Sequence, residues 1–306
     1  MHAYLIIANR NFKQLNLLLR LLDDSRNDIY LLIDQKATYD QAAVKAGIKY
    51  SNLYFVAPLK IYWGSYSQIK AELRLFAQAA QKKYAFYHLL SGLDLPLVSQ
   101  DTIHEFFDQH LHTEFLTFTD KSIATKNRVA DRLDVHLYPN ISERTFNAKV
   151  LRKLYNLYRK AEHLFEHTFH IGLNRLNMDL GYGSNWVSID HDLVMYILSQ
   201  KDWIYKKFRH SVLGDELFIH TLVLNSKFKE RVYVLDGVHD RPTDRQGNLR
   251  YINWWDGGPY TWQQKDLKTL QQVVEQGYFF SRKFDEQADS VIIEQIAANL
   301  LAEKTN

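Results

Sequence analysis

The chain has 306 residues, of which 46% are hydrophobic and 24% charged, so it is long enough to bury a substantial core. Its 38 lysines and arginines against 35 aspartates and glutamates leave a formal charge of only +3, which excludes the broad basic surface of a general nucleic-acid-binding protein. It contains no cysteine, which excludes disulfides, a thiolate metal site and a cysteine nucleophile, and agrees best with a reducing compartment.

The first third of the chain alternates short apolar runs with helical patterns. The opening MHAYLIIANRNF is too short in apolar residues for a secretion signal or a membrane span, and we interpret it as a buried first strand. The patterns predict strands at 3–8, 28–34, 53–56 and 86–90, and helices at 12–22, at 38–46 and from Ser65 or Ser67 onward. Such alternation is typical of βαβ units, so we expect a Rossmann-like half with a largely parallel sheet.

The rest of the chain gives a mixed pattern. It predicts strands at 114–119, 232–236 and 249–255, a long amphipathic helix over about 147–167, helices at 191–199 and 215–224, a loop at 238–248, and a last pair of helices after Asp266 and Asp285. Residues 101–180 are the region in which the pattern is weakest. There is no internal repeat and no low-complexity linker, which favours one catalytic unit.

The common catalytic motifs are missing, and two metal-ligand patterns have alternative explanations. No GxGxxG, GxxxxGK[ST] or GxSxG occurs, which argues against a simple dehydrogenase, a kinase and the common hydrolases. HLFEH places His163 and His167 one helical turn apart, as zinc requires, but no third ligand is identifiable, so a zinc hydrolase is a distant alternative. The one DxD, at Asp190 and Asp192, precedes an apolar helical run. We therefore expect these acids to be helix N-cap or first-turn acids and not metal ligands.

Several blocks occur in a characteristic order. They are AYLIIANRN with the strand ending at Asp34, IYWGSYSQIKAEL (61–73), LLSGLDLPL (89–97), GSNWVSI (183–189) with LGDELFIHTLVLNS (213–226), LRYINWWDGGPYTW (249–262) and FFSRKFD (279–285). In order and spacing they resemble the core-2/I-branching N-acetylglucosaminyltransferase family, glycosyltransferase family 14, which also includes the xylosyltransferases of proteoglycan synthesis. The resemblance covers roughly 1–115 and 181–286.

The resemblance implies an α/β protein with the GT-A glycosyltransferase fold, a Rossmann-like central mixed sheet flanked by helices. We expect a single catalytic domain over 1–306, with a nucleotide-sugar-binding half at 1–115 and an acceptor-binding and catalytic half at 116–306. The high aromatic content, 14%, agrees with a sugar site because aromatic faces pack on the C–H side of a pyranose, although aromatics also fill ordinary cores.

The resemblance assigns the nucleoside to the first half. It implies that Ile7 borders the uracil, that Asp34 bonds the nucleoside, and that Tyr62 and Trp63 lie near the base and diphosphate. On its own, Asp34 would be explained as a strand-end or turn residue, and Trp63 as a buried aromatic beside a helix cap.

The diphosphate is assigned to positive side chains. Asp94 stands alone where other GT-A enzymes carry DxD, and one carboxylate is a poor ligand for a divalent ion, so we expect transfer without a metal. Asp94 is then expected to touch the donor sugar or to fix its loop. The resemblance implies that Lys283 stabilises the leaving diphosphate. The family's upstream arginine has no counterpart here, and Arg282 is the candidate to replace it.

The second half is expected to hold the acceptor and the base. The resemblance implies that Glu216 is the general base that removes the acceptor hydroxyl proton during inverting transfer. The alternative role of Glu216 is a first-turn acid that complements a helix dipole. Ser184, Trp186, Asp215 and Trp254 are the predicted acceptor-binding residues.

We therefore expect an enzyme that transfers a sugar from a UDP-sugar to a hydroxyl of a glycan or lipid-linked glycan. The expected donor is UDP-N-acetylglucosamine, with xylose and glucuronate also open, and no cofactor besides the donor is expected. A capsule or exopolysaccharide role would place it in the cytoplasm, with peripheral association at the inner face of the membrane and no nucleic-acid partner. The alternatives are a metal-dependent transferase that uses Asp94 or the pair Asp190 and Asp192, and a catalytically silent glycan-binding protein.

Overall fold

A computed structural model describes residues 1–134, 145–146, 148–169, 176 and 178–303. The centre is a five-stranded sheet with the order β3-β2-β1-β4-β6. Its strands are β1 (His2–Ala8), β2 (Asn27–Ile33), β3 (Asn52–Phe55), β4 (Phe86–Ser91) and β6 (Ser188–Asp190). The first four are parallel and β6 is antiparallel to β4, which confirms the expected mixed sheet. A second sheet has the order β5-β8-β7, formed by β5 (Leu95–Pro96), β8 (Phe280–Arg282) and β7 (Arg250–Ile252).

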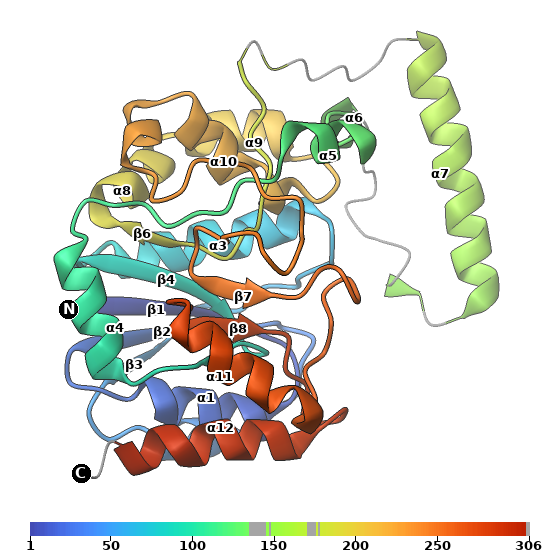
Figure 1. Cartoon of the computed structure of the whole chain (residues 1–306). Coiled ribbons are helices and arrows are strands. Elements are labelled where there is room, and N and C mark those ends of the chain that lie inside the picture. Colours follow the sequence, from blue (N-terminus) through green and yellow to red (C-terminus); the bar gives the residue numbers. More distant parts are fainter. Residues whose placement is uncertain (135–144, 147, 170–175, 177, 304–306) are drawn as a thin grey trace.

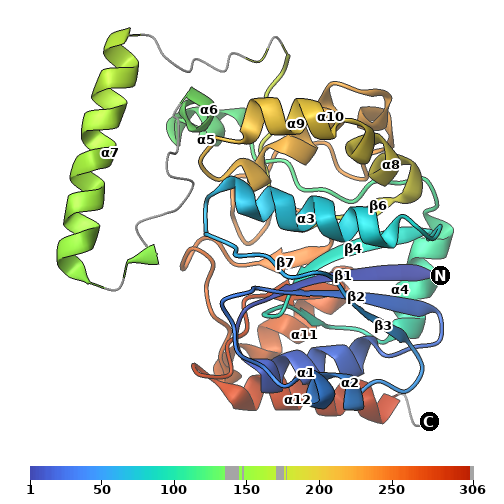
Figure 2. The same cartoon turned by 180° about the vertical axis from the view of Figure 1, so that it is seen from behind.

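Helices cover both faces of the central sheet (Figures 1 and 2). One face carries α1 (Phe12–Leu22), α2 (Gln41–Ala46), α11 (Leu267–Glu275) and α12 (Ser290–Glu303), and the other carries α3 (Tyr66–Ala79), α8 (His191–Ser199), α9 (Lys201–Phe208) and α10 (Phe218–Leu224). In β1, Tyr4 and Ile6 pack into the α1 layer while Ala3 and Leu5 pack into the α3 layer. Successive side chains of a strand point to opposite faces, so a strand buried on both faces is apolar throughout.

Shorter helices fill the remaining connections. They are α4 (Gln100–Gln109), α5 (Lys121–Lys126), α6 (Asp131–Asp134) and the 3₁₀ turns η2 (Gly214–Glu216), η3 (Lys227–Arg231) and η4 (Gln264–Asp266). The long helix α7 (Lys149–Phe169) stands apart from the rest of the fold in both views (Figures 1 and 2). Among the described residues, no helix is both long enough and apolar enough to cross a bilayer.

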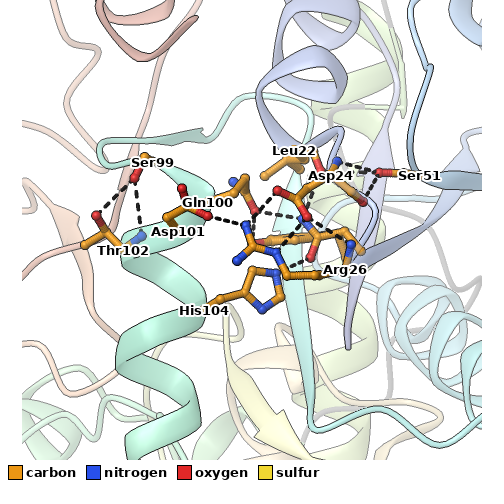
Figure 3. Close-up of polar contacts among 11 residues, drawn as sticks. Leu22, Asp24, Arg26, Ser51, Ser99, Gln100, Asp101, Thr102 and His104 are labelled. Carbon is orange, nitrogen blue, oxygen red and sulfur yellow. Dashed lines mark hydrogen bonds and ion pairs between the residues drawn. The ribbon is translucent and has the colours of Figure 1, made fainter. Parts of the chain in front are cut away.

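A polar network lies at the amino ends of the strands (Figure 3). Arg26 Nη2 lies 2.8 Å from Asp24 Oδ2 and 2.5 Å from Asp101 Oδ1. Nearby, Asn27 Nδ2 donates to Gln100 Oε1 at 2.7 Å. These contacts fasten the first turn of α4 to the start of β2, at the opposite end of the strands from the pocket described below.

Two predicted strands are wrong. Residues 114–119 form only isolated bridges. Glu114 pairs with Val232, Phe115 with Ser188, Phe118 with Gly183 and Thr119 with Val238. The bridge partners lie in two segments, 183–188 and 232–238, and no segment pairs with 114–119 at consecutive positions, so no ladder develops. The predicted strand at 232–236 is likewise reduced to one bridge at Val232, and the strand predicted at 249–255 shortens to β7.

Candidate donor pocket and active site

A pocket of about 380 Å³ opens at the carboxyl ends of β1 and β2. Ligands of open α/β sheets bind outside the carboxyl ends of the strands, where this pocket lies. The volume is within the range of small-molecule sites. Its lining consists of Ile7, Asn9, Asp34, Lys36, Ile61, Tyr62, Trp63, Gln68 and Thr145. The four residues predicted for the nucleoside, Ile7, Asp34, Tyr62 and Trp63, therefore share one pocket.

Asp34 directs its carboxylate to the backbone and to a lysine. Its Oδ1 accepts from Lys36 N at 3.0 Å, and its Oδ2 lies 3.1 Å from Lys36 Nζ. The same ammonium lies 4.4 Å from the ring centroid of Tyr62, a cation–π contact. The pocket thus has a cation beside an aromatic face, suited to a base and an anionic group. Sequence reasoning missed Lys36, whose signal is a lysine two positions after a strand-end aspartate.

The segment before α3 is held in a fixed turn. Ser65 caps α3, as expected, because its Oγ accepts from Ser67 N at 3.3 Å. Gly64 has φ 75°, a conformation that favours glycine, and its carbonyl accepts from Leu213 N at 2.8 Å. The turn leaves Trp63 47% exposed at the pocket rim. Its position differs from the buried aromatic of the alternative interpretation.

Gln68 connects the pocket to the turn that carries Glu216. Its Nε2 donates to Asp215 Oδ2 at 2.8 Å, while its own Oε1 accepts from Gly64 N. Asp215 is buried, so a direct contact with an acceptor, which we expected, would require η2 to move. In this structure Asp215 instead orients a pocket residue. Gln68 has no sequence signal of its own, because a glutamine in an amphipathic helix is common.

Glu216 lies in η2, before α10 (Phe218–Leu224), and not in the first turn of an α-helix as the pattern predicted. Its Oε2 lies 2.7 Å from Arg132 Nη1, with side-chain exposures of 27% and 18%. Burial raises the pKa of Glu216, and the charge and hydrogen bond of Arg132 oppose that rise. A partly exposed carboxylate with a raised pKa is a candidate for proton transfer. Arg132 belongs to the middle region, where the sequence offered no assignment.

Two buried carboxyl groups, Glu72 and Asp215, interact close to Glu216. Glu72 is fully buried, and its Oε1 accepts from Asn185 Nδ2 at 2.9 Å. Burial, with Asp215 as the next cause, raises the pKa of Glu72 well above its usual range. The pKa of Asp215 is raised to about 7. Burial is the largest cause, and the charge of Glu216 is the second. Glu72 Oε2 and Asp215 Oδ1 have no hydrogen-bond partner among the described residues, so this pair favours a protonated state.

Asp94, in the turn after β4, contacts Arg282 at the end of β8 (Phe280–Arg282). Asp94 is buried and accepts from Ser91 N at 3.0 Å and from Ser91 Oγ at 2.8 Å, which confirms that it fixes its loop. Arg282 Nε lies 3.6 Å from Asp94 Oδ1. The guanidinium also stacks on the Trp186 ring at 4.3 Å, and its Nη1 has no hydrogen-bond partner among the described residues. Lys283 follows Arg282 directly at the end of β8 (Phe280–Arg282).

Residues 183–186 join the two parts of the candidate site. Gly183 N donates to the backbone carbonyl of Glu216 at 3.1 Å. Three residues later, the ring of Trp186 stacks against the Arg282 guanidinium. The segment 183–186 therefore contacts both the backbone of the Glu216 turn and the side chain of Arg282. Ser184 is half-buried on this segment. Trp254 lies half-buried just beyond β7 (Arg250–Ile252), in a separate segment.

The predicted metal candidates lie elsewhere. Among the described residues, His112, Asp190 and Asp192 form a group that could hold a metal. Asp190 Oδ1 accepts from Leu193 N at 2.9 Å, which confirms the expected N-cap, and its Oδ2 pairs with Arg231. Asp190 pairs with Phe86, the first residue of β4. It therefore lies at the amino ends of the parallel strands, whereas the pocket lies at their carboxyl ends, so Asp190 and Asp192 cannot reach a donor diphosphate in that pocket. The side chains of His163 and His167 in α7 lie outside the described residues.

The strand order, the helical layers and the pocket at the carboxyl ends define an α/β protein with the GT-A glycosyltransferase fold. The Core-2/I-Branching enzyme family matches residues 2–274, and the chain belongs to this family, as its sequence blocks predicted.

The chain is also similar to individual relatives. The xylosyltransferase oxt of Drosophila melanogaster is 25% identical over 143 residues, which are 42% of this chain and 16% of that protein. The xylosyltransferase sqv-6 of Caenorhabditis briggsae is 30% identical over 128 residues, 39% of this chain and 16% of that one. The xylosyltransferase oxt of Drosophila pseudoobscura pseudoobscura is 21% identical, over 96% of this chain and 32% of that one. The chain thus spans about a third or less of the length of these relatives.

Two solved structures are more distant. Mouse xyloside xylosyltransferase 1 is 12% identical, with a TM-score of 0.37, over 77% of this chain and 86% of that one. Core-mannan synthase A of Aspergillus fumigatus is 14% identical, with a TM-score of 0.36, over 76% of this chain and 72% of that one.

Proposed function

We propose that the protein is an inverting glycosyltransferase that moves a sugar from a UDP-sugar to a hydroxyl of a glycan acceptor without a metal ion. The observation that carries this proposal is the hydrogen-bonded connection from the donor pocket through Gln68 and Asp215 to the turn that holds Glu216. A transferase needs a nucleotide site and a base close to each other, and this connection between the pocket and the Glu216 turn supports the proposal.

Glu216 is the proposed base. Its carboxylate takes the proton of the acceptor hydroxyl while that oxygen attacks the anomeric carbon from the face opposite the departing UDP. Arg132, 2.7 Å from Glu216, opposes the rise in the pKa of this carboxyl that burial causes. The acceptor is proposed to bind along Ser184, Trp186 and Trp254.

The leaving diphosphate is proposed to be met by Arg282 and Lys283. Arg282 Nη1 is buried and has no hydrogen-bond partner among the described residues, and a guanidinium suits phosphate oxygens. Asp94 supports the same conclusion because Ser91 and Arg282 already engage its oxygens, which leaves it a weak candidate for a divalent ion. Donor charge would then be neutralised by fixed cations.

The decisive experiment replaces Glu216 by Gln. Turnover should fall by about 10² to 10⁴, while donor affinity stays nearly unchanged, because a general base acts on the acceptor proton and not on the nucleotide. Glu230→Gln, an exposed glutamate in η3 (Lys227–Arg231), is the matched control and should keep full turnover. Unaltered turnover of Glu216→Gln would remove Glu216 from the mechanism.

A panel of UDP-sugars tests the donor and the metal together. We propose UDP-N-acetylglucosamine as the donor, with UDP-xylose and UDP-glucuronate as the other members of the panel. The thermal shift and the transfer rate should be the same with and without excess EDTA. Loss of activity in EDTA would favour a metal-dependent transferase. An oligosaccharide-induced shift with no shift from any UDP-sugar would favour a silent glycan-binding protein.

We further propose a role in building a capsule or exopolysaccharide, with a lipid-linked or free glycan as acceptor, in the cytoplasm near the inner face of the membrane. The family membership supports glycan synthesis in general. Radiolabelled sugar recovered in a chloroform-soluble product would identify a lipid-linked acceptor, whereas a purely water-soluble product would exclude one.

A further inference from the structure

Helix α7 (Lys149–Phe169) exposes an unusual amount of apolar side chain. Among the described residues, eight of the seventeen strongly exposed large hydrophobic side chains belong to this one helix. They are Val150, Leu151, Leu154, Leu157, Tyr158, Leu164, Phe165 and Phe169. Neither of the two hydrophobic cores includes a described residue of α7. An apolar surface of this size normally marks an interaction site.

The apolar and charged residues lie on different sides of the helix. With successive residues about 100° apart, the eight apolar side chains fill one arc of about 140°. The first twelve residues of α7, 149–160, contain five lysines and arginines and no acid. Lys153 and Lys160 border the apolar arc, so their stems can lie along it while their ammonium groups extend outward.

These features point to one occupant. We propose that α7 binds the surface of an anionic lipid bilayer, with its apolar arc in the acyl boundary and its basic residues on the headgroups. A basic amphipathic helix with leucines and aromatics on its apolar face is the type that lies in a membrane interface. A helix this charged lies on the bilayer and does not span it. A parallel pair of two copies would oppose the positive charges of 149–160, so parallel pairing is less well matched than anionic lipid.

The start of α7 is tied to the donor pocket. Thr145 lines that pocket, and the next residue, Phe146, accepts from Arg152 Nε at 2.6 Å through its carbonyl. The Phe146 ring also contacts Tyr155, with centroids 5.4 Å apart. Membrane binding by α7 would therefore hold the pocket near the bilayer, where a lipid-linked acceptor is found. This last consequence rests on the proposed function, whereas lipid binding itself does not.

The test is co-sedimentation of the full chain with vesicles of phosphatidylcholine, with or without phosphatidylglycerol. The protein should sediment with the anionic vesicles and much less with the neutral ones. Leu154→Glu with Leu157→Glu should abolish sedimentation, whereas Leu111→Glu, an exposed leucine elsewhere, should not. Lys153→Gln with Lys160→Gln should weaken binding by about thirtyfold, since each lysine near an anionic surface contributes about fivefold. The matched control, Lys201→Gln with Lys206→Gln in α9 (Lys201–Phe208), should have no such effect.

Two measurements separate failure of this proposal from other failures. The thermal shift of Leu154→Glu with Leu157→Glu by a UDP-sugar should equal that of the wild type, which shows that the pocket is intact and reports on the proposed function independently. Analytical ultracentrifugation without lipid should give a monomer. Absence of sedimentation with anionic vesicles, equal sedimentation of the double-glutamate variant, or a dimer that this variant dissociates would each overturn the assignment of α7 to lipid.

Discussion

Replacing the buried Asp215 by Asn should make the protein more stable at high pH and leave it nearly unchanged at low pH. The folded state raises the pKa of this carboxyl from 3.8 to about 7, mainly through burial and next through the charge of Glu216. The folded protein therefore binds a proton more tightly than the unfolded chain does. Stability is lost as pH rises from the unfolded pKa toward the folded one, and the loss is complete above the folded pKa.

The magnitude follows from the two pKa values. By linkage, the shifted pKa of Asp215 lowers the free energy of unfolding by about 0.5 kcal/mol at pH 4 and by about 4 kcal/mol at pH 8. Asparagine carries no charge and keeps an oxygen for Gln68 Nε2. Removing the charge of Asp215 also removes one cause of the raised pKa of Glu72.

Urea unfolding followed by tryptophan fluorescence between pH 4 and pH 8 measures the effect. The free energy of unfolding of the variant minus that of the wild type should grow from near zero at pH 4 to several kcal/mol at pH 8. Asp202→Asn, an exposed aspartate in α9 (Lys201–Phe208), is the control and should show a small difference that does not depend on pH. A pH-independent difference for Asp215→Asn, or a variant less stable than the wild type at pH 8, would refute the reasoning.

Three further predictions concern single side chains. Arg132→Gln removes the opposing charge from Glu216, so the acid limb of kcat/KM against pH should move up by about one pH unit or more, and an unchanged limb would contradict the ion pair as its cause. Trp63→Ala should leave the free energy of unfolding within about 0.5 kcal/mol, because the ring is 47% exposed, yet weaken donor binding about tenfold in calorimetry; equal donor affinity would remove Trp63 from the site. Burial lowers the pKa of His104 to about 4, so the folded state loses about 3 kcal/mol relative to the unfolded state as pH falls from above 6.5 to 4. His104→Gln should flatten this part of the stability curve, and an equally steep acid loss in urea titrations would exclude His104 as its source.

The candidate site was predicted in part. Sequence blocks named Ile7, Asp34, Tyr62 and Trp63, and the fold brings all four into one pocket. The family resemblance named them, and they lie near the end of β1, directly after β2 and before α3, at the carboxyl ends of the parallel strands. Lys36, Gln68 and Arg132 were missed. The contacts of Gln68 and Arg132 join residues far apart in the chain, and no local pattern reports such a pairing.

The sequence by itself determined the alternating α/β core, the caps at Ser65 and Asp190 and the order of the family blocks, because period, capping and turn chemistry act over a few neighbouring residues. Only the tertiary structure decided that 114–119 forms bridges without a ladder, that Glu216 lies in a 3₁₀ turn, and that Asp215 is buried under Gln68 while Asp190 lies at the far edge of the sheet. The physical reason is that ladders, burial and shifted pKa values depend on which distant segments meet. Local propensity does not specify those meetings, whereas the packing of two helical layers on one sheet does.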